Sequence, residues 1–322
     1  MKRLRFILIV TGCLTLSACQ TDQTPEAKKK PVEIKQEVIQ TKQGSTIKIV
    51  PLYTEYLQYL QKAGDTQDQT KNQEVFDQTV TDAVKKIVKG DRLHTGILFE
   101  KNYLRSTNYP SELEVRTAEL VKNDLRIKEV VKRQLLASSM KLPGGDKTIF
   151  IVPVDSDVTS FIEPMGGLTA VTFSEDVVVL YLDSKFDEKA LAFATAHEYH
   201  HAVVYENSAL HPSDIMGYVI MEGKADVFAT QIVNDFKPVW QTEMDSRTKQ
   251  NVLYQIKTNL ATSTDLTEGN NDKNIPRWSS YTLGKDFMQD YLKRYPDQSI
   301  KDWTNAKTQD IVKEYRYKNS VQ

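Results

Sequence analysis

One five-residue segment constrains this chain more than any other: residues 197–201 read HEYHH and so place His-Glu-x-x-His inside a predicted helix. An α-helix advances about 3.6 residues per turn, so His197 and His201 lie one above the other and can share one metal ion. Glu198 lies one position further round the helix, close enough to activate a water molecule on that metal. The sequence therefore predicts a metal site on one helix face. The alternative is a surface helix whose charges coincide with the motif.

A strand and a turn are predicted before the motif. Residues 176–183 form an apolar, β-branched run bounded by aspartates, which is typical of a mostly buried strand. Residues 184–187 offer turn and N-cap side chains, and Glu188 follows in the first turn, where a helix favours negative charge. We therefore expect the motif helix to span residues 188–206. A strand beside a metal-bearing helix can hold an extended substrate by edge pairing, and we expect residues 177–182 to do so.

A second helix is predicted downstream, over residues 220–229. Twenty residues separate His201 from Glu222, which is enough to end one helix, cross a loop and start an antiparallel one. A catalytic zinc site needs three protein ligands with one position left open, and Glu222 would complete a set of two histidines and one glutamate. Asp226 falls one turn further on the same face. It could accept the spare N–H of a ligand histidine and so fix the orientation of that histidine.

The pattern Glu-x-x-x-Asp after His-Glu-x-x-His resembles the gluzincin arrangement of thermolysin-type metallopeptidases. The local sequence, AHEYHH followed by EGKAD, more closely resembles the predicted zinc-dependent proteases of domain-of-unknown-function family 2268, over roughly residues 145–318. This resemblance implies a zincin-like part with one Zn²⁺ ion per chain. It also implies that His197, His201 and Glu222 bind the zinc and that Glu198 is the general base.

Three further side chains are candidates for stabilising the oxyanion that forms when a peptide carbonyl is attacked. His211 lies in the loop between the two predicted helices, although loop polarity explains it equally well. Tyr218 and Tyr281 are the other two, and Tyr281 is favoured because residues 278–285 match a tyrosine- and glycine-containing segment of the resembled family. We interpret His200 as a neighbour of the site rather than a ligand, because the i, i+4 spacing fits the motif better.

The first 19 residues have the features of a bacterial export signal. Three basic residues precede an apolar core at residues 6–16, and the small-residue cleavage site LSAC ends at Cys19. A cysteine at this point resembles the bacterial lipobox, which implies lipidation of Cys19 and attachment to the extracytoplasmic face of the cell membrane. The alternative is a short transmembrane anchor, but the apolar core is too short to span a bilayer comfortably.

The composition after the signal predicts a tether and argues against nucleic acid as a partner. Residues 20–45 are polar, rich in lysine and glutamine and poor in aromatic residues, so we expect them to be disordered. Removal of the signal takes away three basic residues and changes the formal net charge from −1 to −4. No basic tract and no interleaving of arginine with aromatic residues points to nucleic acid. Removal of the signal also leaves Cys19 as the only cysteine, so we expect no disulfide.

The remaining sequence predicts a helix-rich α+β fold. Residues 46–142 carry long stretches of helical periodicity after a possible short strand at 46–50, so we expect a helical N-terminal region. Residues 143–322 combine strands at 148–154 and 168–173 with the two motif helices. We expect them to form a zincin-like part with a small sheet beside the metal-bearing helix. About 275 ordered residues can bury a substantial core, as one large or two closely packed units.

These features favour a membrane-anchored, extracytoplasmic zinc peptidase that hydrolyses peptide bonds in a protein or peptide substrate. The metal would activate a water molecule, and Glu198 would take its proton and pass it to the leaving amine. A non-catalytic surface lipoprotein that binds zinc or a partner protein is an alternative, but such a site would not need Glu198. A transporter-associated solute-binding lipoprotein is a third possibility, although it would not need the metal motif.

Overall fold

The computed structural model describes residues 34–64, 66, 68–100, 103–313 and 315. The predicted signal, its lipidation site Cys19 and the predicted tether up to residue 33 lie outside the described residues. From Ile34 onward the described residues form one compact unit. Among the described helices, none combines the length with the apolar content that a bilayer crossing requires.

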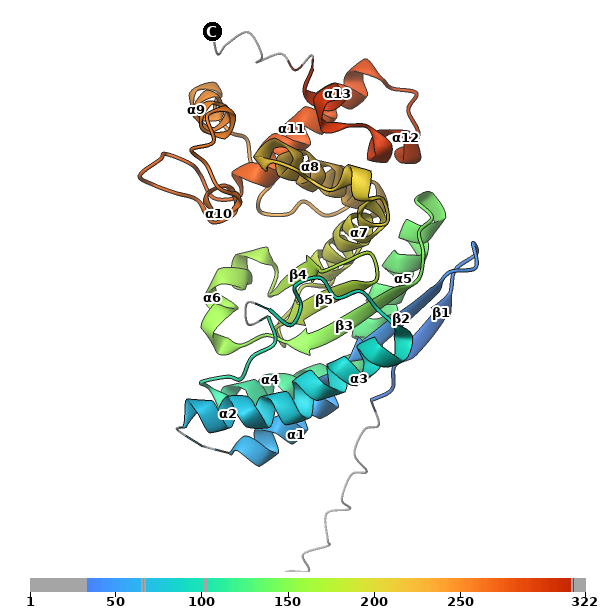
Figure 1. Ribbon diagram of the computed structural model, residues 1–322, viewed down its shortest axis with the longest axis vertical. Helices are drawn as coiled ribbons and strands as arrows, with labels where there is room; N and C mark the ends of the chain where they lie inside the picture. Colours follow the sequence, from blue (N-terminus) through green and yellow to red (C-terminus); the bar gives the residue numbers. More distant parts are fainter. Residues whose placement is uncertain (1–33, 65, 67, 101–102, 314, 316–322) are drawn as a thin grey trace, which may run out of the picture. The chain divides into compact units, whose positions relative to one another are not determined.

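A five-stranded mixed sheet organises the described residues (Figure 1). The strands are ordered β1-β2-β3-β5-β4, with β2, β3 and β5 parallel and each outer strand antiparallel to its neighbour. The inner strands β3 and β5 are rich in valine and isoleucine, which suit a strand that is covered on both faces. The strands are β1 Glu37–Gln40, β2 Thr46–Pro51, β3 Lys147–Pro153, β4 Leu168–Thr172 and β5 Val177–Leu182.

The sheet, together with the helices around it, confirms the predicted helix-rich α+β fold. Order begins earlier than the composition indicates, because Glu37–Gln40, predicted as part of the tether, forms β1 and pairs with β2. The predicted boundary between residues 142 and 143 separates two strands of one sheet, since β2 pairs with β3 in parallel register. The predicted N-terminal region therefore shares its sheet with the part of the chain that carries the motif.

Helices cover both faces of the sheet. Side chains alternate between the faces along a strand, so Ile149 and Ile151 of β3 point to one face and Phe150 and Val152 to the other. The first face packs against α5 and α7, the second packs against α2 and α3, and α1 and α4 contribute side chains to the apolar clusters on both faces. These helices are α1 Tyr53–Ala63, α2 Gln69–Phe76, α3 Asp82–Asp91, α4 Pro110–Lys122, α5 Asp124–Lys141 and α7 Glu188–Tyr205.

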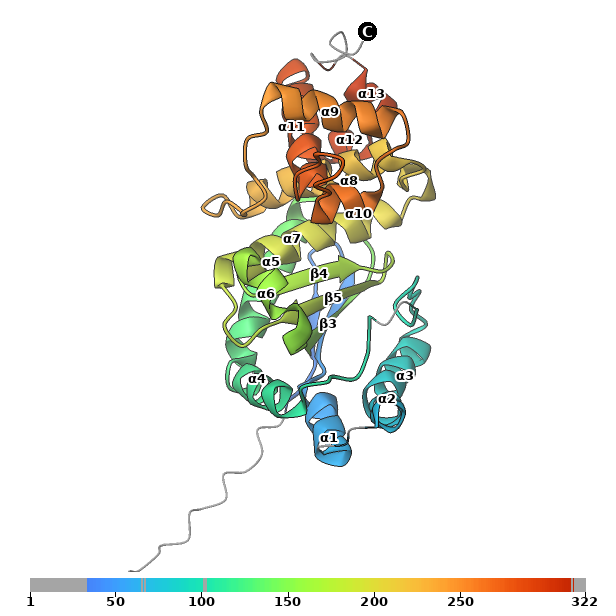
Figure 2. The ribbon, with the colours of Figure 1, turned by 90° about the vertical axis from the view of Figure 1, so that its left-hand side faces the viewer.

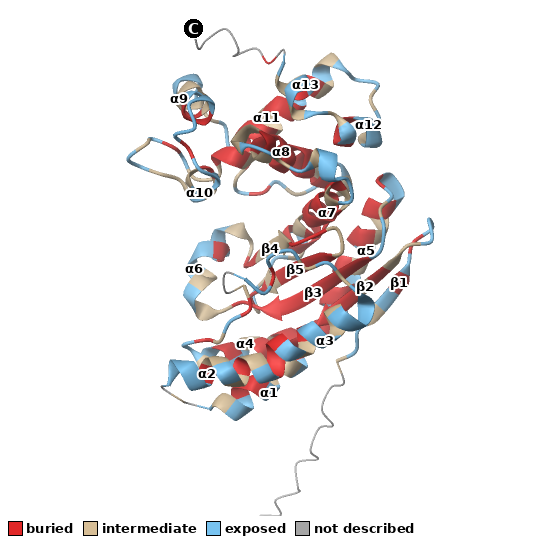
Figure 3. Ribbon diagram, in the orientation of Figure 1, coloured by how far each residue is buried: buried red, intermediate tan, exposed pale blue. Residues whose placement is uncertain are grey.

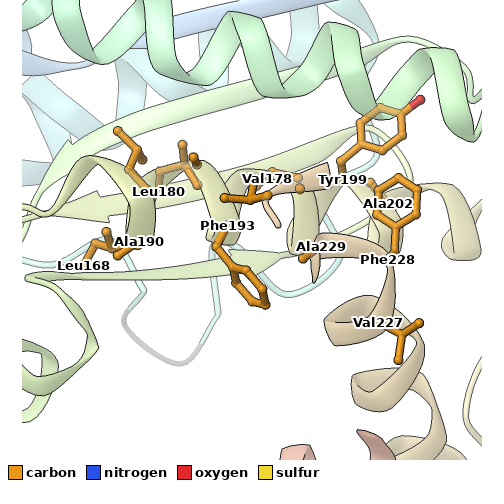
Figure 4. Close-up of a cluster of buried hydrophobic side chains, with 14 of the residues drawn as sticks. Leu168, Val178, Leu180, Ala190, Phe193, Tyr199, Ala202, Val227, Phe228 and Ala229 are labelled. Carbon is orange, nitrogen blue, oxygen red and sulfur yellow. The ribbon is translucent and has the colours of Figure 1, made fainter. Parts of the chain in front are cut away.

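Helix α7 lies between the sheet and the C-terminal helices (Figure 2). It is buried along nearly its whole length, as the red ribbon in Figure 3 shows. Phe193, Tyr199 and Ala202 of α7 join Phe228 and Ala229 of α8 in one apolar cluster (Figure 4). The remaining helices are α6 Thr159–Ile162, α8 Ile215–Ile232, α9 Ser246–Lys257, α10 Ser263–Glu268, α11 Ser279–Arg294, α12 Ile300–Asn305 and α13 Thr308–Val312.

Aspartate N-caps start the two helices that carry the predicted ligands. The Asp187 carboxylate accepts a hydrogen bond from the backbone N–H of Ala190, at the start of α7. The Asp214 carboxylate accepts one from the backbone N–H of Gly217, at the start of α8. Each cap satisfies a backbone N–H that has no partner inside the helix. The bounds of α7 confirm the helix predicted over residues 188–206.

Helices α8 and α11 cross at two glycines, Gly223 and Gly284. A Cβ atom on Gly284 would lie 2.2 Å from the backbone oxygen of Val219 and 2.6 Å from the backbone nitrogen of Gly223. These distances are shorter than van der Waals contact, so the crossing requires residues without a Cβ atom. Gly223 follows Glu222 directly, and Tyr281 precedes Gly284 by about one helical turn. The glycine contact therefore brings Tyr281 towards the predicted ligands.

Replacing Gly284 with alanine is expected to lower the free energy of unfolding by about 1–3 kcal/mol, because the added methyl group overpacks the α8–α11 crossing. Gly90→Ala in α3 is the matched control, since a Cβ atom there meets nothing within 4 Å. Alanine's better helix propensity should raise the free energy of unfolding in that variant by up to about 1 kcal/mol. Urea unfolding measures both effects, and changes of the same sign would contradict the packing argument.

Candidate metal centre

Three predicted ligand side chains meet between α7 and α8. The Nε2 atoms of His197 and His201 lie 3.0 Å apart. The Oε2 atom of Glu222 lies 3.2 Å from Nε2 of His197 and 3.5 Å from Nε2 of His201. All three residues are buried. One helical turn aligns the two histidines, and the packing of α8 against α7 supplies the glutamate.

The spacing of these three atoms fits a zinc ion. Zinc binds histidine nitrogen and carboxylate oxygen at about 2.0–2.2 Å in tetrahedral geometry, which separates two ligand atoms by about 3.3 Å. The observed separations of 3.0, 3.2 and 3.5 Å lie around this value. Two imidazole nitrogens that face each other can share only a single proton, so a cation is the partner that satisfies all three ligand atoms together.

Acidic side chains surround His197. Its Nδ1 atom lies 3.1 Å from Oδ1 of Asp226, as expected for a carboxylate that orients a ligand histidine. Burial by itself lowers the pKa of His197, but hydrogen bonds with Asp226 and Glu222 outweigh burial and raise this pKa to about 10. Burial raises the pKa of Glu222, but the neighbouring His201 and His197 lower it to about 2. The centre therefore favours a positive charge between its carboxylates.

The other two histidines of the motif have different surroundings. The Nδ1 atom of His201 is buried and has no hydrogen-bond partner among the described residues, so this ring lacks the carboxylate that orients His197. His200 faces α12, where its Nε2 atom lies 3.2 Å from the Thr304 hydroxyl and its ring stacks on Trp303. The structure thus places His200 beside the three ligand atoms and outside their group.

The edge strand holds Glu198. The Thr172 hydroxyl, at the end of β4, donates to Oε2 of Glu198 at 2.7 Å. Thr172 was not among the predicted site residues. The alternating pattern of the strand at residues 168–173 could have indicated Thr172. Leu168 and Ala170 belong to the apolar cluster on the α7 side of the sheet, and Val171 belongs to the cluster on the opposite side. By the same alternation Thr172 faces the helix.

The strand with a free edge beside α7 is β4 and not β5. Because β5 lies between β3 and β4, both of its edges are paired, so the prediction that residues 177–182 hold a substrate is wrong. The backbone N–H of Phe173 donates to the oxygen of Val177, which identifies the odd-numbered residues of β4 as those that bond to β5. Hydrogen-bonded positions alternate in an antiparallel pair, so the backbone groups of Ala170 point to the free edge.

Tyr281 lies against the centre from α11. Its ring centroid is 6.0 Å from that of His197 and 5.3 Å from that of Trp240. Burial raises the pKa of Tyr281 well above its ordinary value, so the phenol keeps its proton. Its hydroxyl has no hydrogen-bond partner among the described residues. The Tyr218 hydroxyl, in contrast, lies 2.9 Å from the hydroxyl of Thr267. Tyr281 is therefore the better placed of the two predicted tyrosines.

His211 is engaged elsewhere. The residue is exposed, and its Nε2 atom lies 3.1 Å from the backbone oxygen of Tyr205, to which it donates. Its ring also packs edge-on against the Tyr205 ring at 5.1 Å. The structure does not place His211 with the three ligand atoms. Its ring nitrogen bonds instead to the backbone carbonyl group of Tyr205, at the C-terminal end of α7. Tyr205 itself lies one turn beyond His201 and was not among the predicted site residues.

A narrow cleft of about 50 Å³ lies beside His197 and Glu198. One wall is β4, and the others come from α7, α11 and the segment that follows α8. The walls are mainly apolar and aromatic, and include Leu168, Ala170, Phe193, Phe236, Trp240 and Tyr281. A larger hollow of about 780 Å³, between α4 and α6, is lined by none of the predicted site residues.

A comparison with protein-family profiles supports the family resemblance that the motif residues indicate. The profile described as "Predicted Zn-dependent protease (DUF2268)" matches residues 127–313, more than half of the chain. The chain belongs to the DUF2268 family. The match to DUF2268 runs from α5 to just past α13, so it contains the three converging ligands, Glu198 and Tyr281. It confirms the resemblance predicted over roughly residues 145–318. No curated protein and no solved structure matches the chain.

Metal analysis of the protein without residues 1–19 tests the centre in this DUF2268 protein. The unaltered protein is expected to carry about one zinc ion per chain. His197→Ala should lose the ion because only two of the three protein ligands would remain. His211→Ala is the control and should keep the metal, since its ring bonds to Tyr205. A chelator should lower the melting temperature of the unaltered protein, because bound metal stabilises the folded state. Full zinc content in His197→Ala would exclude this centre.

Proposed function

We propose that this DUF2268 protein is a zinc peptidase that hydrolyses peptide bonds at the extracytoplasmic face of the cell membrane. The observation that carries the proposal is the convergence of His197, His201 and Glu222, whose ligand atoms lie within 3.5 Å of one another. Glu198 belongs to α7, the helix that carries both histidines, and the free edge of β4 lies beside it. These are the parts that a peptidase needs for water activation and substrate alignment.

The chain's own groups divide the proposed chemistry between them. A zinc ion held by His197, His201 and Glu222 supplies a Lewis acid that polarises a carbonyl group and makes water more acidic. Glu198 takes a proton from the attacking water and passes it to the leaving amine. Thr172 bonds to Oε2 of Glu198, which orients this carboxylate and leaves Oε1 to face the water.

Tyr281 would assist at the carbonyl oxygen. Its hydroxyl keeps its proton because burial raises its pKa. A protonated phenol without another partner can donate a hydrogen bond to the oxyanion that develops on the attacked carbonyl. The glycine crossing of α8 and α11 fixes its helix against the ligands. Of the three candidates His211, Tyr218 and Tyr281, we therefore assign this role to Tyr281.

The free edge of β4 suits an extended peptide as substrate. The backbone groups of Ala170 point outward, and an extended chain could pair with them as an additional strand. Such pairing would lay the peptide backbone along the cleft, beside His197 and Glu198. Backbone pairing does not select side chains, so this edge supports a protein or peptide substrate as a class.

A catalytic centre explains the arrangement better than a structural zinc site. Structural sites surround zinc with four protein ligands, whereas catalytic sites use three. Among the described residues the group has three members, and both nearby histidines bond elsewhere: His200 to Thr304 and His211 to Tyr205. A non-catalytic binding lipoprotein would also not require a general base, which is the role that we propose for the Glu198 carboxylate. The membrane location rests on the lipobox-like Cys19, which would attach the chain through a lipid.

Glu198→Gln tests the base. This variant should keep its zinc, because Glu198 is not among the three converging ligands, but should lose hydrolysis by about 10²–10⁴-fold, because an amide cannot take the proton from water. Cleavage of a peptide library and metal analysis of the same preparation measure both effects. Undiminished peptidase activity in a zinc-loaded Glu198→Gln sample would remove Glu198 from this role.

Tyr281→Phe tests the oxyanion donor against a matched control. The loss of its hydroxyl is expected to reduce kcat by about 10²–10³-fold with little change in zinc content, as for other single oxyanion donors. Tyr218→Phe removes the same atom from a tyrosine that bonds to Thr267, and should leave kcat much closer to that of the unaltered protein. Steady-state kinetics on one peptide compare the two variants. A larger loss in Tyr218→Phe would reverse the assignment.

A further inference from the structure

Trp240 follows α8 in the sequence and reaches back to the metal centre. Its indole Nε1–H donates to both carboxylate oxygens of Asp226, at 2.9 Å to Oδ2 and 3.2 Å to Oδ1. Oδ1 of Asp226 in turn lies 3.1 Å from Nδ1 of His197. Two successive hydrogen bonds therefore connect Trp240 to a proposed zinc ligand.

Asp226 depends on this indole. The residue is fully buried, at 0% exposure, and a buried carboxylate without hydrogen-bond partners is costly. Among the described residues, its carboxylate bonds to His197 and Trp240, and Oδ2 bonds to Trp240 alone. Loss of the indole N–H would leave Oδ2 unpaired. The carboxylate would then be free to turn away from His197.

The surroundings of Trp240 fix the indole in place. Its backbone oxygen accepts a hydrogen bond from the Thr282 hydroxyl of α11 at 3.0 Å. Its ring packs against Phe193 of α7 and Tyr281 of α11, with ring centroids 6.0 and 5.3 Å away. The same ring lines the cleft beside His197. One side chain is thus both a wall of the cleft and a donor to Asp226.

We infer that Trp240 is a positioning residue for the metal centre: its N–H holds Asp226 against His197 and so sets how tightly the centre binds zinc. The inference rests on the proposed zinc site and adds to it a residue outside the two ligand motifs. Loss of an outer hydrogen-bond partner of a metal ligand typically weakens metal binding about 10–100-fold. Trp240 acts one hydrogen bond further out, so we expect the lower end of that range.

Trp240→Phe is the primary test, because it keeps an aromatic ring at the site and removes the indole N–H. Competition with a chromophoric chelator measures zinc affinity, which should fall by about tenfold. Trp278→Phe is the matched control: it makes the same change in a tryptophan whose ring centroid lies 6.4 Å from that of Trp240. No hydrogen bond joins Trp278 to Asp226 within the described residues, so its zinc affinity should stay unchanged.

A double-mutant cycle separates positioning from packing. If Trp240 acts through the carboxylate, Trp240→Phe should have no further effect on zinc affinity in an Asp226→Ala background, where no side-chain oxygen remains to accept from the indole N–H. The absorption spectrum of Co²⁺ bound at the centre gives a second readout, because a change in the orientation of His197 alters the ligand field. Trp240→Tyr is a second variant without the indole N–H, for use if Trp240→Phe does not fold.

The possible results are distinct. Failure of the unaltered protein to bind zinc would overturn the proposed site itself. Zinc binding by the unaltered protein with equal affinity in Trp240→Phe and Trp240→Tyr would overturn only the role of Trp240. An undiminished effect of Trp240→Phe in the Asp226→Ala background would also overturn it, because the indole would then act through packing.

Discussion

The burial of α7 is the constraint on which the rest of the structure depends. The helix lies between the sheet and the C-terminal helices, and its polar motif residues are buried with it. Burying a polar or charged group is costly unless that group has a partner, and three neighbouring elements supply such partners to α7. Thr172 of β4, Glu222 and Asp226 of α8, and Thr304 of α12 fill these roles. The buried charged groups that converge on α7 also form a candidate cation site inside the core.

The grouping of the candidate ligands could be predicted from sequence because it depends largely on local helix geometry. The helical spacing that aligns His197 with His201 also aligns Glu222 with Asp226. Both alignments follow from helix geometry alone and do not depend on the tertiary fold. The order of the strands is a different matter, because it depends on contacts between distant segments. Residues 168–173 and 177–182 are both short apolar runs, and nothing within either run says which one has a neighbour on each side. The edge strand was therefore assigned wrongly.

Two other features depend on partners that the local sequence does not contain. Glu37–Gln40 lies within a polar, lysine- and glutamine-rich stretch, yet it forms an edge strand because β2 offers its backbone groups for pairing and Ile39 is buried in the core. Trp240 is one of three tryptophans, and its contact with Asp226 exists because the segment after α8 folds back over the cleft. The aspartate could be predicted from its spacing, whereas the indole that completes its hydrogen bonds required the fold.

The pairing of β2 with β3 limits how far the chain can be truncated from its N-terminus. The region that matches the DUF2268 profile starts at residue 127, whereas β1 and β2 end at residue 51. A fragment limited to the matched region would lack β2 and would expose the hydrogen-bonding edge of β3. This strand is buried along its whole length and is rich in β-branched residues. Unpaired strands of this kind recruit further chains and aggregate. The N-terminal hairpin therefore protects the sheet from self-association, and we expect the part of the chain that carries the candidate metal centre to depend on this hairpin for solubility.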